Sequence, residues 1–175
     1  TWSPAFVSNT TSGTYTFTPG AGQCATTTTL SVTVTPNVTP TFNAIPAFCA
    51  GSAAPTLPGT STNGITGTWS PATISNTSSA TYTFTPGAGQ CATTTTLDVT
   101  VTPNVTPTFN AIPAFCAGSA APALPGTSTN GITGTWSPAL VSNTTSGTYT
   151  FTPAVGLCAT TTTLSVTVTP NVTPN

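Results

Sequence analysis

The chain has 175 residues, and they include no Lys, no Arg, no His and a single acidic side chain, Asp98. General acid–base catalysis needs a group that titrates near neutral pH, and only Asp98 and the five Cys could serve. We therefore expect no enzyme activity and no cofactor. Without a cation the chain cannot neutralise phosphate, which excludes nucleic-acid binding by charge. One carboxylate without His argues against a Ca²⁺ or Zn²⁺ site, and no apolar run is long enough to span a bilayer.

The sequence repeats with a fixed period. Trp2, Trp69 and Trp136 stand 67 residues apart, each in the motif Thr-Trp-Ser-Pro. A constant period of this size indicates a tandem array of small modules. The predicted division is the C-terminal half of a repeat at 1–37, complete repeats at 38–104 and 105–171, and the start of the next linker at 172–175. Asp98 is Ser in the other two copies, so we interpret it as a solvent-facing strand residue.

Each repeat is expected to be built from strands. Pro and Gly occur too often for a helix of useful length, and β-branched residues dominate between them. In chain order within 38–104, the expected elements are weak strands at 38–42 and 55–57, a strand through 65–69, a turn at 76–80, a strand at 81–85, a turn at 87–90 and a strand at 93–102. Six or seven short strands with turns between them indicate a β-sandwich.

Aromatic side chains on the inward faces are the predicted core. The strand at 81–85 alternates, so Tyr82 and Phe84 share one face, and Trp69 shares a face with Ile65. The Tyr82 segment resembles a tyrosine corner, in which the hydroxyl ties a loop back to a strand. The predicted core residues are Trp2, Trp69, Trp136, Tyr15, Tyr82, Tyr149, Phe84 and Phe151.

The five cysteines leave two disulfide registers open. Their spacings alternate between 25 and 42 residues, at Cys24, Cys49, Cys91, Cys116 and Cys158. One register pairs Cys49 with Cys91 and Cys116 with Cys158, and leaves Cys24 unpaired in this stretch. The other pairs Cys24 with Cys49 and Cys91 with Cys116. We favour the first register because it keeps each bridge inside one repeat. Disulfides imply an oxidising, extracellular compartment, and free buried thiols are the alternative.

The links between repeats contain two Pro residues in a short stretch, as at Pro103 and Pro107. Such a link is extended and stiff. The sequence therefore predicts an all-β tandem array of small disulfide-stapled, immunoglobulin-like β-sandwich modules that form a rod.

Three motifs follow one another in the last complete repeat. They are Phe115-Cys116-Ala117-Gly118, then Gly134-Thr135-Trp136-Ser137-Pro138, then Gly147-Thr148-Tyr149-Thr150-Phe151-Thr152-Pro153. In this order they resemble the immunoglobulin-like repeats of very large surface adhesins of Bacteroidota, including the SprB-type gliding-motility adhesins. The resemblance covers the half repeat and both complete repeats. It implies export by type 9 secretion and display at the cell surface.

That resemblance implies a stalk or filament region of a long extracellular adhesin that serves adhesion or gliding motility. The implied partners are neighbouring repeats of the same chain, identical filaments or the surface motility machinery; the ligand at the tip is not identified. One alternative is the subunit of a self-assembling filament joined by strand complementation, which the half repeat at 1–37 motivates. Another is an ice- or carbohydrate-binding surface on Thr-rich strands, which the twist of a sandwich disfavours.

Overall fold

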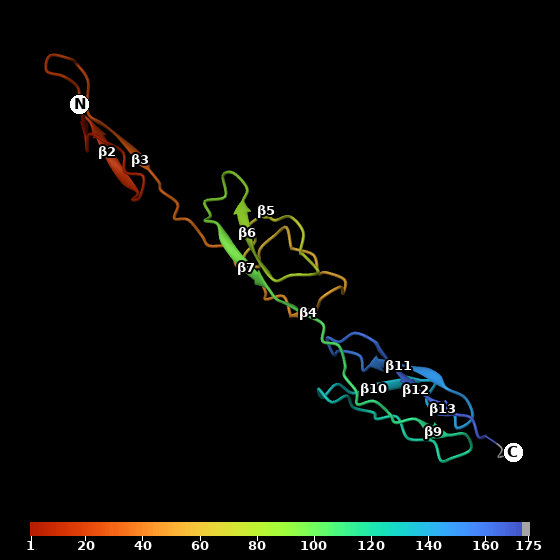
Figure 1. Cartoon of the computed structure of the whole chain (residues 1–175). Coiled ribbons are helices and arrows are strands. Elements are labelled where there is room, and N and C mark those ends of the chain that lie inside the picture. The colour runs from red at the N-terminus through yellow and green to blue at the C-terminus, as the bar shows by residue number, and fades with distance from the viewer. Residues whose placement is uncertain (173–175) are drawn as a thin grey trace. The chain divides into compact units, whose positions relative to one another are not determined.

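The computed structural model describes residues 1–172. The regular secondary structure of these residues consists of β-strands (Figure 1). Three similar three-stranded antiparallel sheets recur along the chain. They consist of β1 (Trp2–Ser3), β2 (Gly13–Phe17) and β3 (Thr28–Val32), then β5 (Gly67–Ser70), β6 (Ala80–Pro86) and β7 (Thr95–Val99), then β10 (Gly134–Ser137), β11 (Gly147–Pro153) and β12 (Thr162–Val166). Of the linker predicted at 172–175, residues 173–175 lie outside the described part.

Two parallel pairs of very short strands accompany the sheets. The strand β4 (Phe48–Cys49) pairs with β8 (Val101–Thr102), and β9 (Phe115–Cys116) pairs with β13 (Val168–Thr169). The sequence carries no signal for β4 or β9, since two residues are too few for an alternating pattern. Both contain a cysteine, and the one in β4, Cys49, forms the disulfide, whereas Cys116 in β9 is free.

The chain divides into two compact units whose boundary runs through the predicted repeat 38–104. The first unit comprises Thr1–Asn43, Leu57–Thr73 and Tyr82–Leu97, and the second comprises Ala44–Thr56, Ile74–Thr81 and Asp98–Asn175. The second unit therefore contains the whole of the predicted repeat 105–171.

The core of the second unit follows from the alternation of β11. Tyr149 and Phe151 are buried, and the threonines between and beside them point to the other face. Trp136 on β10 lies opposite Phe151, and Leu164 on β12 lies opposite Tyr149. The side chains of Ile112, Phe115 and Leu124, from the first half of the repeat, pack against this cluster. Period-two alternation thus builds one half of the core, and the loop-rich first half of the repeat covers it.

Three aromatic rings meet at the centre of this core. The ring centroid of Phe109 lies 4.8 Å from that of Trp136 and 4.7 Å from that of Phe151, and the centroids of Trp136 and Phe151 are 5.1 Å apart. The pairs are tilted or edge-on, which are arrangements that aromatic pairs prefer. The indole Nε1–H of Trp136 donates to the carbonyl of Pro125 at 2.8 Å, so its polar atom is satisfied. In the first unit Phe42, Trp69 and Phe84 form the same triad. Phe42 and Phe109 were not among the predicted core residues.

The strand predicted at 93–102, and its copy at 160–169, is interrupted. In the later copy β12 ends at Val166 and β13 begins at Val168. The hydroxyl of Ser146 accepts a hydrogen bond from the Val168 N–H at 2.9 Å and donates to the Val168 carbonyl at 3.3 Å. Ser146 therefore replaces the neighbouring strand at this point, and the chain turns from β11 to pair with β9. Val166 and Val168 are both buried.

A tyrosine hydroxyl holds the loop that precedes the central strand. The Ser142 N–H donates to the hydroxyl of Tyr149 at 2.8 Å, and the Ser8 N–H donates to that of Tyr15 at the same distance. Both tyrosines are buried. At these two positions the tie between loop and strand that the tyrosine motif predicts is present.

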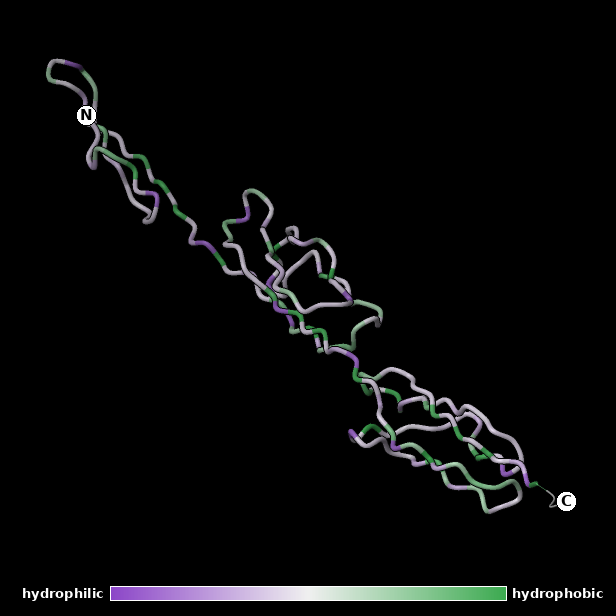
Figure 2. Tube along the Cα trace, in the orientation of Figure 1, coloured by the Kyte–Doolittle hydropathy of each residue, from purple (hydrophilic) through white to green (hydrophobic). Residues whose placement is uncertain are grey.

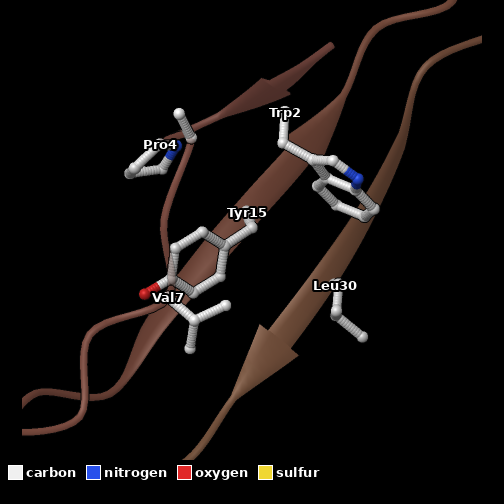
Figure 3. Close-up of a pocket in the computed structure, with 6 residues that line it drawn as sticks. Trp2, Pro4, Val7, Tyr15 and Leu30 are labelled. Atoms are coloured by element: carbon white, nitrogen blue, oxygen red, sulfur yellow. The ribbon is translucent and has the colours of Figure 1, made fainter.

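Residues 1–37 show the same sheet with one face uncovered (Figure 3). Trp2 is 43% exposed, whereas Trp136 is 9% exposed. A cavity of about 260 Å³ opens between Trp2, Tyr15 and Leu30. This corrects the prediction of Trp2 as a core residue. The physical reason is that no counterpart of Phe109, Ile112 and Leu124 precedes this sheet in the described chain.

The chain is rich in neutral polar residues and carries almost no charge. Most of the chain trace in Figure 2 is pale, because the abundant Thr and Ser have intermediate hydropathy. Asp98 is exposed on β7 and accepts a hydrogen bond from the Thr81 hydroxyl, in agreement with its interpretation as a solvent-facing strand residue. Among the described residues no buried side-chain nitrogen or oxygen lacks a hydrogen-bond partner.

Glycine at the start of β10 permits the aromatic packing, which leads to a first prediction. A Cβ on Gly134 would lie 2.3 Å from the Thr152 carbonyl oxygen and 2.6 Å from Cζ of Phe151. We expect Gly134→Ala to destabilise the repeat by about 1–3 kcal/mol through overpacking. Hydrogen–deuterium exchange of the full chain, followed by mass spectrometry of peptides from 134–168, would detect the loss locally.

The matched control is Gly126→Ala, because a Cβ at Gly126 has no neighbouring atom within 4 Å. We expect this variant to exchange like the unchanged protein. Equal protection in the two variants would contradict the close packing of β10 on β11.

Candidate functional site

The candidate site is the disulfide between Cys49 and Cys158, whose Cα atoms lie 5.1 Å apart across 109 residues of sequence. Both cysteines belong to the second compact unit. The bond joins a residue of the predicted repeat 38–104 to a residue of the predicted repeat 105–171. It is therefore a joint between successive repeats.

Backbone hydrogen bonds position Cys49. It ends β4, which pairs with β8, and the next residue continues the pairing, since the Ala50 N–H donates to the Thr102 carbonyl at 2.9 Å. The Gly51 N–H then donates to the Asn76 carbonyl at 2.7 Å. Cys49 thus lies beside the last residues of its own repeat, close to where the chain enters the next one.

The chain that enters the next repeat positions Cys158. The Val105 N–H donates to the carbonyl of Cys158 at 2.9 Å, and the Val105 carbonyl accepts from the Thr160 N–H at 3.0 Å. This is a parallel bridge between Val105 and Ala159. The first residue of the repeat is therefore fixed beside the cysteine near its end.

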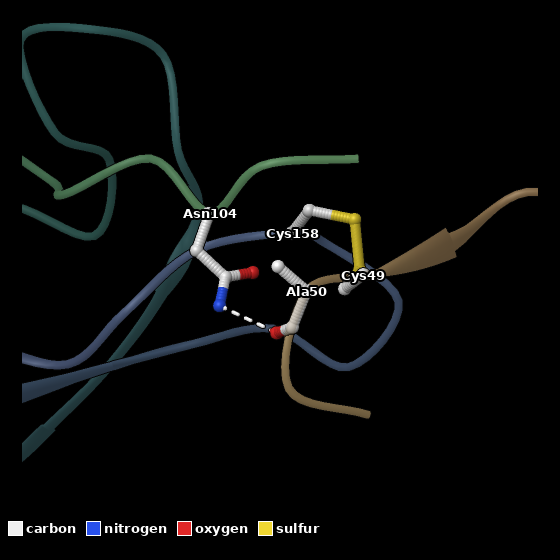
Figure 4. Close-up of a disulfide and its surroundings, with 4 residues drawn as sticks. All are labelled: Cys49, Ala50, Asn104 and Cys158. Atoms are coloured by element: carbon white, nitrogen blue, oxygen red, sulfur yellow. Dashed lines mark hydrogen bonds between the residues drawn. A yellow bond between two sulfur atoms is a disulfide. The ribbon is translucent and has the colours of Figure 1, made fainter. Parts of the chain in front are cut away.

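Asn104 completes the joint, as Figure 4 shows. Its side-chain amide donates to the carbonyl of Ala50 at 2.9 Å, and its backbone continues directly into Val105. The two link residues 104 and 105 thus bind the chain next to Cys49 on one side and Cys158 on the other. The disulfide closes an arrangement that three further hydrogen bonds already define.

This bond corrects the predicted pairing. Neither Cys49–Cys91 nor Cys116–Cys158 is present; Cys91 and Cys116 carry free, exposed thiols, as does Cys24. Neither does the structure contain the alternative pairs Cys24–Cys49 and Cys91–Cys116. The reason is topological: β8 leads from beside Cys49 straight into the link, and the link runs beside Cys158. The separation of 109 residues spans three successive cysteine spacings. The prediction paired only cysteines that are neighbours in the sequence, so it did not include this bond.

An open crevice of about 540 Å³ lies beside the disulfide. Cys49, Ala50, Ser52, Asn104, Leu157 and Ala159 are among the residues that line it. None of these side chains carries a charge. Thiol–disulfide exchange is therefore the chemistry that this site offers. Within residues 1–172, His, Cys, Asp and Glu side chains form no group of three that could hold a metal ion.

Comparison of the chain with protein-family models and with curated proteins finds no match. In the part of the chain that the structure describes, no helix has the length and apolar character needed to cross a bilayer.

The amide of Asn104 provides a second prediction. We expect Asn104→Ala to speed reduction of the Cys49–Cys158 bond by dithiothreitol about two- to tenfold, because one hydrogen bond worth ~0.5–1.5 kcal/mol no longer opposes opening of the joint. Timed alkylation of the released thiols, read by mass spectrometry, measures the rate.

The matched control is Asn171→Ala. Asn171 donates the equivalent hydrogen bond, at 3.1 Å, to the carbonyl of Ala117 beside the unbonded Cys116. This variant should leave the reduction rate of the Cys49–Cys158 bond unchanged. Equal rates of reduction of the Cys49–Cys158 bond in the unchanged protein and in Asn104→Ala would refute a role of the amide in the joint.

Proposed function

We propose that this chain is a structural stalk or filament region of a long, repetitive extracellular adhesin on a bacterial cell surface. In this proposal immunoglobulin-like β-sandwich repeats stack into a rod that serves adhesion or gliding motility, after export by type 9 secretion. The observation that carries it is the disulfide from Cys49 to Cys158 between successive repeats.

The mechanical consequence of that bond supports the proposal. Tension that enters the chain at Cys49 has a covalent path to Cys158 that bypasses the 109-residue separation between them. The load then does not pass through the part of the repeat 105–171 that precedes Cys158. The hydrogen bonds and the core that this part forms are therefore not under tension. This property suits a protein that holds a load away from a cell surface, whereas a binding module that bears no load gains nothing from it.

The composition supports the same role. The chain has one acidic and no basic side chain, so its surface offers almost nothing to titrate or to screen with salt. Disulfides persist in oxidising, extracellular environments. The three sheets with their aromatic clusters are near-copies of one another, as expected of a spacer that gains length by adding repeats.

The location is tested on intact cells of the organism that makes the protein. Antibodies against the recombinant chain should label these cells without permeabilisation, in projections or patches outside the outer surface. Labelling that requires permeabilisation would contradict the proposal. An antibody against a cytoplasmic protein serves as the control for cell integrity.

Single-molecule stretching tests the load-bearing role and is our third prediction. A fully extended chain spans about 3.3–3.6 Å per residue, so the 109 residues between Cys49 and Cys158 span about 360–390 Å when extended. The disulfide prevents this stretch of chain from extending. We expect a chain held near its two ends to extend by this amount less when oxidised than in reductant. Cys158→Ser should extend fully in both conditions, and the same full extension of the unchanged oxidised chain would contradict the proposal.

A further inference from the structure

The cysteines of this array fall into two kinds. Cys49 and Cys116 follow the Phe of a short parallel strand in the first half of a repeat, and we call them first-half cysteines. The second-half cysteines lie in the turn after the central strand of each sheet, and they are Cys24, Cys91 and Cys158. The disulfide present joins one cysteine of each kind, from successive repeats.

The unbonded Cys116 has the surroundings of the bonded Cys49. The next residue donates its N–H to a strand carbonyl at 2.9 Å in both places, Ala50 to Thr102 and Ala117 to Thr169. An asparagine amide caps the same residue's carbonyl, at 2.9 Å from Asn104 and at 3.1 Å from Asn171. The backbone frame that orients Cys49 for its bond is therefore complete at Cys116, which is exposed.

The unbonded Cys91 likewise has the frame of Cys158. Its carbonyl accepts from the Val38 N–H at 2.8 Å, as that of Cys158 accepts from Val105 at 2.9 Å. The Thr93 N–H donates to the Val38 carbonyl at 3.0 Å, as the Thr160 N–H does to the Val105 carbonyl. One feature differs: Cys91 has a φ of 44°, in the left-handed region, and Cys158 does not. Bonding in the geometry of Cys158 therefore includes a backbone rotation at Cys91.

We propose that Cys116 on one side, and Cys91 and Cys24 on the other, are open halves of the same joint. Each takes a cysteine of the complementary kind from another copy of the repeat. At the separation of 109 residues, the partner of Cys116 would follow position 175 and the partner of Cys91 would precede position 1. The partner is thus a further repeat of the same chain or a repeat of a second copy. This inference extends the joint and does not depend on where the protein is located.

The chemistry is thiol–disulfide exchange with a low-molecular-weight disulfide such as oxidised glutathione. The thiolate of one cysteine attacks that disulfide, forms a mixed disulfide and releases one reduced thiol. The thiolate of the complementary cysteine then attacks the protein sulfur and releases the second reduced thiol. Two cysteine thiols lose two protons and two electrons, and the small disulfide is reduced to two thiols.

The experiment uses the full 175-residue chain with its Cys49–Cys158 bond intact, as an equal mixture of ¹⁵N-labelled and unlabelled protein in glutathione buffer. The isotope distinguishes bonds between chains from bonds within one chain. We expect covalent oligomers in which Cys116 bonds to Cys91 or Cys24 of another chain, at least tenfold in excess over like pairs. Dominant Cys116–Cys116 or Cys91–Cys91 bonds, an intrachain Cys91–Cys116 bond, or no oligomer would overturn the proposal.

A relocated thiol controls for simple exposure. We expect Cys116→Ser to abolish the oligomers, and addition of Ser119→Cys to this variant not to restore them, although Ser119 is also exposed. Restoration to the original level would overturn the proposal, because any exposed thiol in this region would then suffice.

A lengthened chain, with a second copy of residues 105–171 added after Asn171, distinguishes the two sources of the partner. If the source is the same chain, Cys116 bonds to the added copy of Cys158 and the monomer mass falls by two hydrogens. If it is a second chain, oligomers through Cys116 persist. Either result supports the joint, and a Cys116 that stays free or capped by glutathione would overturn it.

Discussion

The bond between Cys49 and Cys158 is the constraint on which the organisation of this chain depends. Each repeat is small, and a domain of about 60 residues buries only about 60% of its unfolded surface. Its core is one triad of aromatic rings together with Tyr149 and a rim of aliphatic side chains. On the chain-entropy estimate, closing a loop of about 100 residues stabilises a protein by about 4.7 kcal/mol. A contribution of that size matters to repeats whose own cores are so limited.

Hydroxyl and amide side chains perform the tasks that ion pairs perform in other proteins. Ser146 replaces a strand partner at Val168, Tyr149 holds its loop, and Asn104 caps the joint. Each contact depends on a neutral hydrogen bond with at least one backbone partner, so neither pH near neutrality nor salt should alter it strongly. This use of neutral groups allows a chain with a single carboxylate to satisfy its buried polar atoms within residues 1–172.

Much of the structure of the second half of each repeat could be predicted from the sequence, and little of the structure of the first half. Alternation placed Tyr149 and Phe151 on one face of a strand, and the tyrosine motif predicted that the hydroxyl holds a loop, which the structure shows to be the loop at Ser142. The first half carries Phe109 and Cys116 on segments too short or too rich in Pro for a periodic signal. The core position of Phe109 was therefore not predicted, and the bond predicted for Cys116 was wrong. The same gap explains the disulfide. Pairing Cys49 with Cys158 depends on β4 and on the path of the link, and local spacing reveals neither.

The most direct test is disulfide mapping of the native, oxidised chain after digestion with chymotrypsin, with free thiols alkylated beforehand. The account predicts one peptide pair that contains Cys49 and Cys158, with alkylated Cys24, Cys91 and Cys116 in monomeric protein. In Cys91→Ser the bond should remain. Bonds from Cys49 to Cys91 and from Cys116 to Cys158 would contradict it, because each repeat would then be closed on itself and no disulfide would join it to the next.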